Sequence, residues 1–268
     1  MSGQFHHESD PAEARDDQAR LANAETAVEA DRIRAVYKRY GTDWIDADHQ
    51  NPGRQAMHSE RNEERNEKFR TILHEQLGKP IENSNFLDLG CDFGEDLRYI
   101  ESLGAKYHNL YGIDLLRDRI EKAKKIYPSY KFFLGDAALM QSIGVMFDVI
   151  IIMTVFSSIL FDGMVYDIVD NLDSVLSPGG MILWYDIRYP SPSNPHVRAM
   201  TLGRIRKFFP SWRLDLEPVS LLAPVSRRLG AFSRLLYRPL ASVPCLRSHY
   251  IGTIRRNASA PGPERAGA

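Results

Sequence analysis

The sequence predicts an α/β protein with a mainly parallel sheet, and three observations carry this prediction. Short apolar runs alternate with helical patterns about every 20 to 30 residues, which is typical of right-handed βαβ crossovers. The stretch from Phe86 to Leu97 passes from an apolar run through a glycine-containing turn into a helix start. Asp114 and Asp136 stand at the ends of the next two apolar runs, where parallel strands present ligand-binding residues.

The first 80 residues precede the predicted sheet. Residues 1–30 contain almost no large apolar side chains, so we expect a flexible tail that can bury too little surface to offset the entropy of ordering. Residues 31–80 predict a helical extension, with one helix that starts near Asp31 and another from roughly Ser59 to Leu77. We expect this extension to help cover the site.

Residues 81–256 are expected to form one domain. Its parallel strands are predicted at Phe86 to Gly90, Leu110 to Asp114, Tyr130 to Leu134, Phe147 to Met153 and Met181 to Asp186. The helices between them are predicted at Glu95 to Leu103, Arg117 to Tyr127, Ala137 to Ser142 and Asp162 to Leu176. A turn of Ser, Pro and two Gly residues at 177–180 leads into the fifth strand.

The remainder of the chain predicts more of the same sheet and an inserted segment. A loop from Ile187 to Pro195 is followed by a helix around Val197 to Phe209. Two further strands are predicted, near Trp212 to Leu222 and near Ser248 to Arg255. Between them, residues 223–246 form an arginine-rich amphipathic insert that resembles a lid, and residues 257–268 are expected to be a disordered tail.

Composition limits the partners and the compartment. Thirty-four basic against thirty-five acidic residues give a formal net charge of -1, which supplies no global field for nucleic acid or an anionic membrane. The two cysteines, Cys91 and Cys245, are too few for a disulfide framework or a zinc cluster, and we expect no metal site. The N-terminus lacks a signal-peptide pattern and no apolar run is long enough to span a bilayer, so we expect a cytoplasmic protein.

The turn after the first strand gathers the residues of a ligand site. Asp88 places a carboxylate in an apolar strand, which is costly unless a cationic or multi-donor ligand pairs with it. Gly90 and Gly94 permit positive φ and a close backbone approach. Asp114 follows Gly90 by 24 positions (114 − 90), the distance expected for a ribose-binding carboxylate, and Asp136 is placed to accept from an adenine amino group. Acidic groups at adjacent strand ends suit a positively charged nucleoside better than a pyrophosphate.

Five motifs in order support a family resemblance. They are Leu87-Asp88-Leu89-Gly90-Cys91-x-x-Gly94, Tyr111-Gly112-Ile113-Asp114, Gly135-Asp136, Phe147-Asp148-Val149-Ile150 and Leu176-Ser177-Pro178-Gly179-Gly180. In this combination the chain resembles the class I S-adenosylmethionine-dependent methyltransferases. The resemblance implies a Rossmann-like seven-stranded sheet in the order 3-2-1-4-5-7-6, with the last strand antiparallel. It also implies that S-adenosylmethionine is bound by Asp88, Gly90, Cys91, Asp92, Gly94, Asp114, Leu115, Asp136, Ala137 and Thr154.

Asp92 departs from the family pattern, which usually has glycine at this position. Asp tolerates the left-handed backbone region better than most residues, so the turn can form. The extra carboxylate either favours the positive groups of the cofactor or marks a site that no longer binds it. A simpler interpretation also exists for Asp114 and Asp136, because Asp is favoured as a helix N-cap.

The acceptor side should be formed by residues after the fourth and fifth strands. His196 is the best candidate for a base that accepts a proton from a hydroxyl, and Asp186 is a second candidate catalytic residue. Asp186 could instead pair with Arg188 as part of the scaffold. If the sixth strand runs parallel to the first five, the insert at 223–246 lies on the cofactor side, and its arginines could meet an anionic acceptor or a membrane surface.

These observations favour an O-methyltransferase of a sugar or another small metabolite. The stretch from Trp184 to Arg198 resembles bacterial methyltransferases found with polysaccharide or natural-product pathways. The acceptor is expected to be a glycosylated or anionic small molecule, ranked above a membrane lipid, and nucleic acid is not expected. The alternatives are N-methylation of a small molecule and a non-catalytic methyltransferase-like protein that serves as a binding partner or scaffold.

Overall fold

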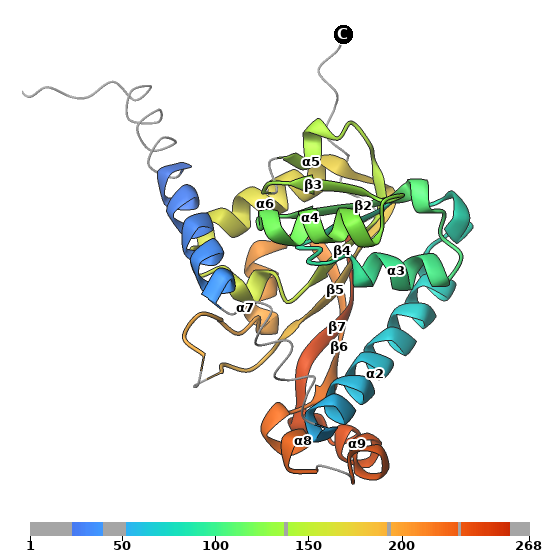
Figure 1. The fold of residues 1–268 in the computed structure, drawn as a ribbon, viewed down its shortest axis with the longest axis vertical. Coiled ribbons are helices and arrows are strands. Elements are labelled where there is room, and N and C mark those ends of the chain that lie inside the picture. The colour runs from blue at the N-terminus through green and yellow to red at the C-terminus, as the bar shows by residue number, and fades with distance from the viewer. Residues whose placement is uncertain (1–22, 40–51, 137–138, 192–193, 230–231, 258–268) are drawn as a thin grey trace, which may run out of the picture.

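The computed structural model describes residues 23–39, 52–136, 139–191, 194–229 and 232–257 (Figure 1). Seven strands form one sheet in the order β3-β2-β1-β4-β5-β7-β6, which confirms the expected topology. Strand β7 is antiparallel to both of its neighbours, β5 and β6, and the other pairings are parallel. The strands are β1 (Phe86–Leu89), β2 (Leu110–Asp114), β3 (Lys131–Leu134), β4 (Phe147–Met153), β5 (Leu176–Ile187), β6 (Trp212–Leu221) and β7 (Arg247–Arg256).

Helices cover both faces of the sheet. One face packs against α2 (Pro52–Gln76), α3 (Glu95–Ser102) and α4 (Arg117–Ile126), and the other packs against α5 (Leu139–Ser142), α6 (Asp162–Val175) and α7 (Leu202–Phe208). Strand β4 shows the reason, because it is apolar on both sides: Val149 and Ile151 face the first group, while Ile150 and Ile152 face the second. The middle of the sheet is therefore rigid, and its strand ends can position a site.

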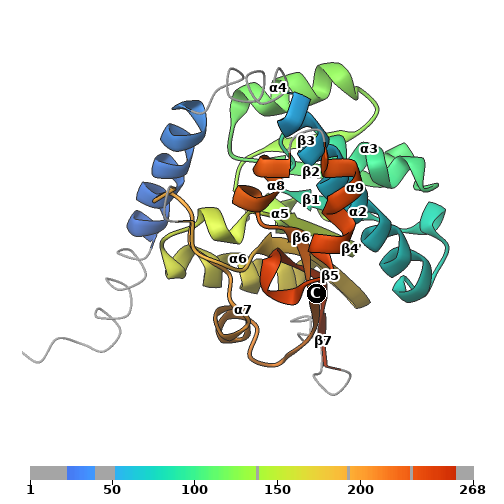
Figure 2. The ribbon, with the colours of Figure 1, turned by 90° about the horizontal axis from the view of Figure 1, so that it is seen from below.

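The N-terminal extension is helical and lies against the domain. Residues 23–39 form a helix beside α6 (Figures 1 and 2), where Thr26 Oγ1 donates to Asp167 Oδ2 at 3.1 Å. This helix includes residues 23–30, which the sequence assigned to the flexible tail, because Ala30 and Ile33 join the core against α6. Residues 1–22 and 258–268, the rest of both predicted tails, lie outside the described residues.

Other boundaries also differ from the prediction. Helix α2 begins at Pro52 and not near Ser59, and two differences later in the chain have a structural reason. The helix expected from Val197 begins at Leu202, because the preceding backbone makes other bonds: Arg198 N donates to Ser157 O and Met200 N to Ile187 O. The turn at 177–180 falls inside the bounds of β5. There the pairing partner of β4 jumps from Leu176 to Met181, so these four residues form an irregularity in the strand rather than a separate turn.

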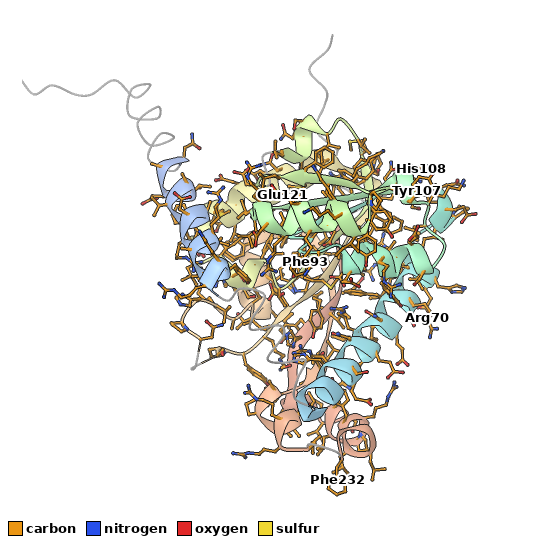
Figure 3. All side chains as sticks on the ribbon, viewed as in Figure 1. Arg70, Phe93, Tyr107, His108, Glu121 and Phe232 are labelled. Carbon is orange, nitrogen blue, oxygen red and sulfur yellow. The ribbon has the colours of Figure 1, made fainter. Side chains whose placement is uncertain are left out.

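The insert between β6 and β7 folds as a pair of short helices, α8 (Ala223–Leu229) and α9 (Ser233–Ala241). The pair lies beside α2 in both views (Figures 1 and 2). Phe232 projects from it, away from the sheet (Figure 3). No helix among the described residues is long and apolar enough to cross a lipid bilayer.

Candidate functional site

A cavity of about 350 Å³ opens at the carboxyl ends of β1, β2 and β4. The residues that line it from these ends include Leu89, Gly90, Asp92, Asp114, Leu115 and Thr154. The 23–39 helix contributes Ile33 and Tyr37, and α2 contributes Arg61, Asn62 and Arg65. The two parts of the N-terminal extension therefore border the site that the sequence analysis expected them to cover.

The turn between β1 and α3 brings the backbone close to the cavity. Gly90 N and Cys91 N both donate to Ile113 O, at 2.8 and 3.0 Å, which fixes the start of the turn against β2. Gly90 has φ +77°, and a Cβ built on it would lie 2.7 Å from Cγ2 of Val155. Only glycine fits this position without moving Val155. Gly94 also has a left-handed backbone, with φ +87°, but it does not line the cavity.

Asp92 occupies its turn position with φ +46° and is held by two contacts. Its backbone N donates to Asp114 Oδ2 at 3.0 Å, and its Oδ1 lies 2.5 Å from Nη1 of Arg119 on α4. Burial raises the pKa of Asp92, and the charge of Arg119 opposes that shift. The guanidinium also lies over the ring of Phe93, 5.1 Å from its centroid. The extra carboxylate in the turn is therefore paired within the protein.

The carboxylate of Asp114 is oriented by the backbone. Its Oδ2 accepts from Asp92 N, and its Oδ1 accepts from Leu116 N at 2.9 Å. Burial raises the pKa of Asp114, and these two hydrogen bonds oppose the shift. Each oxygen accepts one backbone hydrogen bond, and a carboxylate oxygen has room for two. Asp114 can therefore still accept hydrogen bonds from a ligand in the cavity.

The other residues predicted to bind the cofactor fall into three groups. Asp136, Leu115 and Thr154 line the cavity, and Thr154 has an unusual φ of +53° for a β-branched residue. Asp88 and Cys91 are buried behind the turn and do not line the cavity. Ala137 lies outside the described residues.

Asp88 is a buried carboxyl next to other acidic groups. It is 1% exposed, and its Oδ2 has no hydrogen-bond partner among the described residues. Burial, followed by the charges of Asp96 and Asp114, raises its pKa well above the ordinary value, and Arg65 opposes this effect. From the sequence we expected a ligand to pair with Asp88, and in the structure the charge of Arg65 lies near it.

Neither of the two predicted catalytic residues borders the cavity. His196 lies in the loop after β5, where its backbone N donates to Asn194 Oδ1 at 3.0 Å. Asp186 is fully buried in β5 and accepts from Ser157 N at 3.0 Å and Ile187 N at 2.7 Å. Burial raises its pKa to about 6. Asp186 therefore fastens the segment after β4 to β5, and its environment is that of a structural residue.

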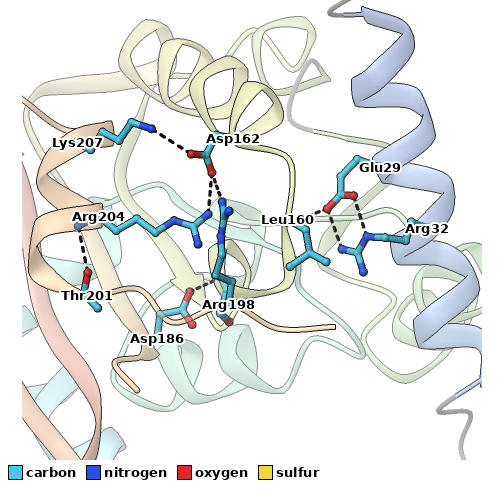
Figure 4. Close-up of polar contacts among 10 residues, drawn as sticks. Glu29, Arg32, Leu160, Asp162, Asp186, Arg198, Thr201, Arg204 and Lys207 are labelled. Carbon is cyan, nitrogen blue, oxygen red and sulfur yellow. Dashed lines mark hydrogen bonds and ion pairs between the residues drawn. The ribbon is translucent and has the colours of Figure 1, made fainter. Parts of the chain in front are cut away.

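The alternative pairing of Asp186 with Arg188 is absent among the described contacts. Arg188 donates to Pro244 O at 3.3 Å and lies over the rings of Tyr189 and Tyr250. A different basic cluster lies near Asp186, where Arg198, Arg204 and Lys207 surround Asp162 (Figure 4). This cluster joins α6 to the segment around α7.

Ion-paired side chains fasten the 23–39 helix over the site (Figure 4). Glu29 binds Arg32 with both oxygens at 2.8 Å, and its Oε1 accepts from Leu160 N at 2.5 Å. Arg32 Nη2 donates to Ser158 O at 2.6 Å, and Tyr37 Oη lies 2.6 Å from Ser158 Oγ. These contacts connect the helix to the segment that follows β4, so its position depends on the same strand end that forms the cavity.

The insert does not contribute to the cavity lining among the residues that the structure describes. Its Tyr237 Oη donates to Glu64 Oε2 at 2.9 Å, and Arg238 forms an ion pair with Glu67 at 3.1 Å. Both partners belong to α2, which does line the cavity. The insert therefore supports α2 from outside, and the cationic residues at the cavity come from α2 and α4 instead.

The cavity-lining residues that could not be predicted from the sequence include Arg61, Arg65, Tyr185 and His249. Tyr185 and His249 stack with ring centroids 4.5 Å apart and an interplanar angle of 8°. The guanidinium of Arg65 lies 5.9 Å from the centroid of Tyr185. A histidine within an apolar strand was the one available signal, since His249 precedes the apolar residues Tyr250 and Ile251.

A family model described as a methyltransferase domain matches residues 61–226. No curated protein matches the sequence. Among solved structures, magnesium protoporphyrin IX methyltransferase from Synechocystis PCC 6803 with bound SAH is 12% identical, with a TM-score of 0.60, and the match covers 85% of this chain and 100% of that one. The plantazolicin methyltransferase in complex with SAH is 15% identical, with a TM-score of 0.55, and the match covers 88% of this chain and 100% of that one. A SAM-dependent methyltransferase from Archaeoglobus fulgidus is 15% identical, with a TM-score of 0.50, and the match covers 72% of this chain and 94% of that one.

Proposed function

The chain belongs to the family of methyltransferase domains, and from this premise we propose that it methylates a hydroxyl group of a sugar or another small metabolite. It is an S-adenosylmethionine-dependent methyltransferase. The observation that carries the proposal is the covered cavity at the ends of β1, β2 and β4, whose volume of about 350 Å³ lies within the usual range for small-molecule sites.

The residues around the cavity fit S-adenosylmethionine. Asp114 has unused acceptor capacity at the end of β2, and we assign it to the ribose hydroxyls. Asp136 lies at the end of β3 and is assigned to the adenine amino group, with Leu115 beside the ring. The glycine at position 90 keeps the backbone of the turn open to the ligand. The cofactor supplies an electrophilic methyl group on a sulfonium.

The protein contributes alignment and the exclusion of water. Methyl transfer needs the acceptor atom in line with the methyl group, so holding both molecules in one geometry supplies much of the acceleration. The 23–39 helix and α2 border the cavity from outside the sheet. Their fastening through Glu29 and Tyr237 gives the cavity fixed walls that limit the access of water.

A small acceptor is supported by the shape and the charge of the molecule. The formal net charge of -1 supplies no attraction for a nucleic acid, and the covering elements leave a cavity instead of an open groove. Two of the similar solved structures are named for small-molecule or natural-product methylation, those of magnesium protoporphyrin IX and of plantazolicin. We carry over from them only the class of acceptor.

Transfer of a labelled methyl group tests the proposal. Purified protein and labelled S-adenosylmethionine are incubated with pools of sugars, nucleotide sugars and small hydroxylated metabolites. Label in an acid-stable and base-stable methyl ether supports O-methylation. Label found only on nitrogen, or binding of the cofactor with no transfer to any pool, contradicts it in favour of the N-methyl or the non-catalytic alternative.

A further inference from the structure

The part of the cavity lined by α2, β5 and β7 contains a cationic and aromatic group of residues that the cofactor assignment does not use. We propose that Arg61, Tyr185 and His249 form the acceptor subsite: Arg61 binds an anionic group of the acceptor, and Nε2 of His249 takes the proton of the acceptor hydroxyl. This inference rests on the proposed O-methyltransferase function. It replaces His196, which does not line the cavity, as the base.

The hydrogen bonds of Ser248 determine which nitrogen of His249 carries the proton. His249 Nδ1 lies 2.7 Å from Ser248 Oγ, and the same hydroxyl lies 3.0 Å from Ser220 O and 3.4 Å from Leu221 O. Carbonyl oxygens only accept, so the 3.0 Å contact with Ser220 O is a hydrogen bond only if the single hydroxyl proton points there, and we assign it there. The hydroxyl oxygen must then accept from Nδ1–H. Nε2 is left with its lone pair, and it has no hydrogen-bond partner among the described residues.

Packing fixes the plane of the imidazole ring. Its face stacks on Tyr185 at a centroid distance of 4.5 Å, and Tyr185 Oη is 2.9 Å from Ser220 Oγ. Ser220 is itself held in a left-handed conformation, with φ +63°, and its N donates to Glu64 Oε2 on α2. A buried non-glycine residue in this conformation is retained only where the surroundings enforce it. The ring is thus held rigidly at the cavity wall, as a base that must meet a specific proton requires.

Arg61 supplies a positive charge that no carboxylate neutralises among the residues that the structure describes. Arg65 forms an ion pair with Asp96 at 3.1 Å. Arg61 Nη2 instead lies 2.8 Å from His58 Nδ1, and no carboxylate in the described part of the chain is within ion-pair distance of it. A guanidinium that lines a cavity without a carboxylate partner is suited to a carboxylate or a phosphate, which it can bind with two parallel hydrogen bonds.

Burial and two neighbouring positive charges keep His249 neutral, as a base that accepts a proton must be. Burial, followed by the charges of Arg61 and Arg65 on α2, lowers its pKa to about 3. The other ionisable groups of this network include His58, which contacts Arg61, and Tyr237, which donates to Glu64. The pKa values of Tyr185 on β5 and Glu64 on α2 are both raised, chiefly by burial. An anion bound at Arg61 opposes the two positive charges, so it raises the basicity of His249 when the acceptor is in place.

The acceptor oxygen forms a bond to the methyl carbon, and the carbon–sulfur bond breaks with its electron pair left on sulfur. The hydroxyl proton moves to Nε2 of His249, which then carries a positive charge and releases the proton to solvent. The products are a methyl ether and a neutral thioether, so no further reactant is needed.

Nuclear magnetic resonance of the histidine rings tests the subsite without a known acceptor. In full-length protein at neutral pH with S-adenosylhomocysteine present, the ring ¹⁵N shifts of His249 should show a protonated Nδ1 and an unprotonated Nε2. Inorganic phosphate should move these resonances. Arg61→Gln should abolish the response, and Arg70→Gln should retain it, because Arg70 lies on α2 outside this cavity (Figure 3). A protonated Nε2, no response to phosphate, or an equal response in Arg61→Gln overturns the proposal.

Turnover supplies an independent test. Hydroxy acids and the matching neutral hydroxy amides are compared as acceptors of labelled methyl. We expect the acids to be preferred by wild type, with a preference at least about tenfold smaller in Arg61→Gln through a higher KM. His249→Asn should lower kcat by about 100-fold or more, with unchanged cofactor affinity by calorimetry. Preference for the amides, or full kcat in His249→Asn, contradicts the subsite. Absence of cofactor binding by wild type would contradict the proposed function instead. If neither the acids nor the amides are methylated, the resonance experiment decides whether Arg61 and His249 form the subsite.

Discussion

Nη1 of Arg119 lies 2.5 Å from Oδ1 of Asp92, in the turn where the family usually has glycine. The sequence left two interpretations of this extra carboxylate, and the pairing favours neither a direct contact with the cofactor nor a lost site. The pair adds no net charge to the cavity, while Asp92 N still holds Asp114 in place. The departure from the family pattern is thus compensated by a residue of α4.

Removing the charge of Asp92 should therefore expose the charge of Arg119 to the cofactor. We expect Asp92→Asn to weaken S-adenosylmethionine binding by roughly 1 kcal/mol, about fivefold, because the sulfonium is positive. Binding of S-adenosylhomocysteine, whose sulfur is neutral, should change less. Calorimetry with both ligands measures the two affinities. Adding Arg119→Gln to Asp92→Asn should restore much of the lost affinity for S-adenosylmethionine. Equal losses for the two ligands would show that the pair acts through the shape of the turn.

Gly90 gives a prediction with a matched control. Gly90→Ala places a Cβ 2.7 Å from Val155 in a residue with φ +77°, so we expect both loss of stability and at least about tenfold weaker cofactor binding. Gly144→Ala meets a similar φ of +70° with nothing within 4 Å. It should cost about 1 kcal/mol of stability without changing the affinity. Thermal unfolding and calorimetry compare the variants. Equal affinities would mean that the approach at Gly90 is unrelated to the cofactor.

The contacts of Glu29 predict that the 23–39 helix is held in place by one carboxylate. Burial tends to raise the pKa of Glu29, but the hydrogen bonds from Arg32 and Leu160 N outweigh it and the pKa is lowered. Glu29→Gln should lower the unfolding free energy by about 1 to 2 kcal/mol and accelerate amide hydrogen exchange across the helix. Asp31→Asn removes the exposed pair with Arg34 in the same helix, and it should change the unfolding free energy by less than about 0.5 kcal/mol. If exchange is equal in both variants, Glu29 does not fasten the helix.

Asp186 should make stability depend on pH in a defined direction. Burial raises its folded-state pKa from 3.8 to about 6, so the folded protein binds more protons than the unfolded chain between these values. The unfolding free energy should therefore fall as the pH rises from about 4 to about 6. From pH 4 to pH 7 we expect wild type to lose about 2 kcal/mol more of its unfolding free energy than Asp186→Asn. Denaturant unfolding over this range tests it, and parallel pH profiles would contradict a buried, protonated Asp186.

The sheet was predictable because its information is local. Strands such as β4 are continuous apolar runs, which the sequence shows directly. Asp114 is the last residue of β2, so its position at the strand end could also be predicted from the local sequence. The strand order came from the family resemblance, and the structure confirms it. Predicted element boundaries were wrong where residues distant in the chain determine them. Met200 is an example, because its backbone N donates to Ile187 O instead of taking part in the predicted helix.

The acceptor side was not predictable because it is assembled over long distances in the chain. His249 reaches Tyr185 only through the antiparallel pairing of β7 with β5, in which Ile187 is opposite His249. Arg61 comes from a helix that precedes the domain by sequence and whose local pattern is simply charged. His196 was chosen for its position after a strand, which gave no information about the direction of its loop.

The most direct test of the account is calorimetric titration of the full-length protein with S-adenosylmethionine, for wild type and for Asp114→Asn. Wild type should bind one equivalent. Asp114→Asn, which removes the charge of the carboxylate assigned to the ribose, should bind at least about tenfold more weakly. Asp118→Asn, a charge removal on α4 outside the cavity, should bind like wild type. Unchanged affinity in Asp114→Asn, or no heat of binding for wild type at millimolar cofactor, would contradict the assignment of this cavity to the cofactor.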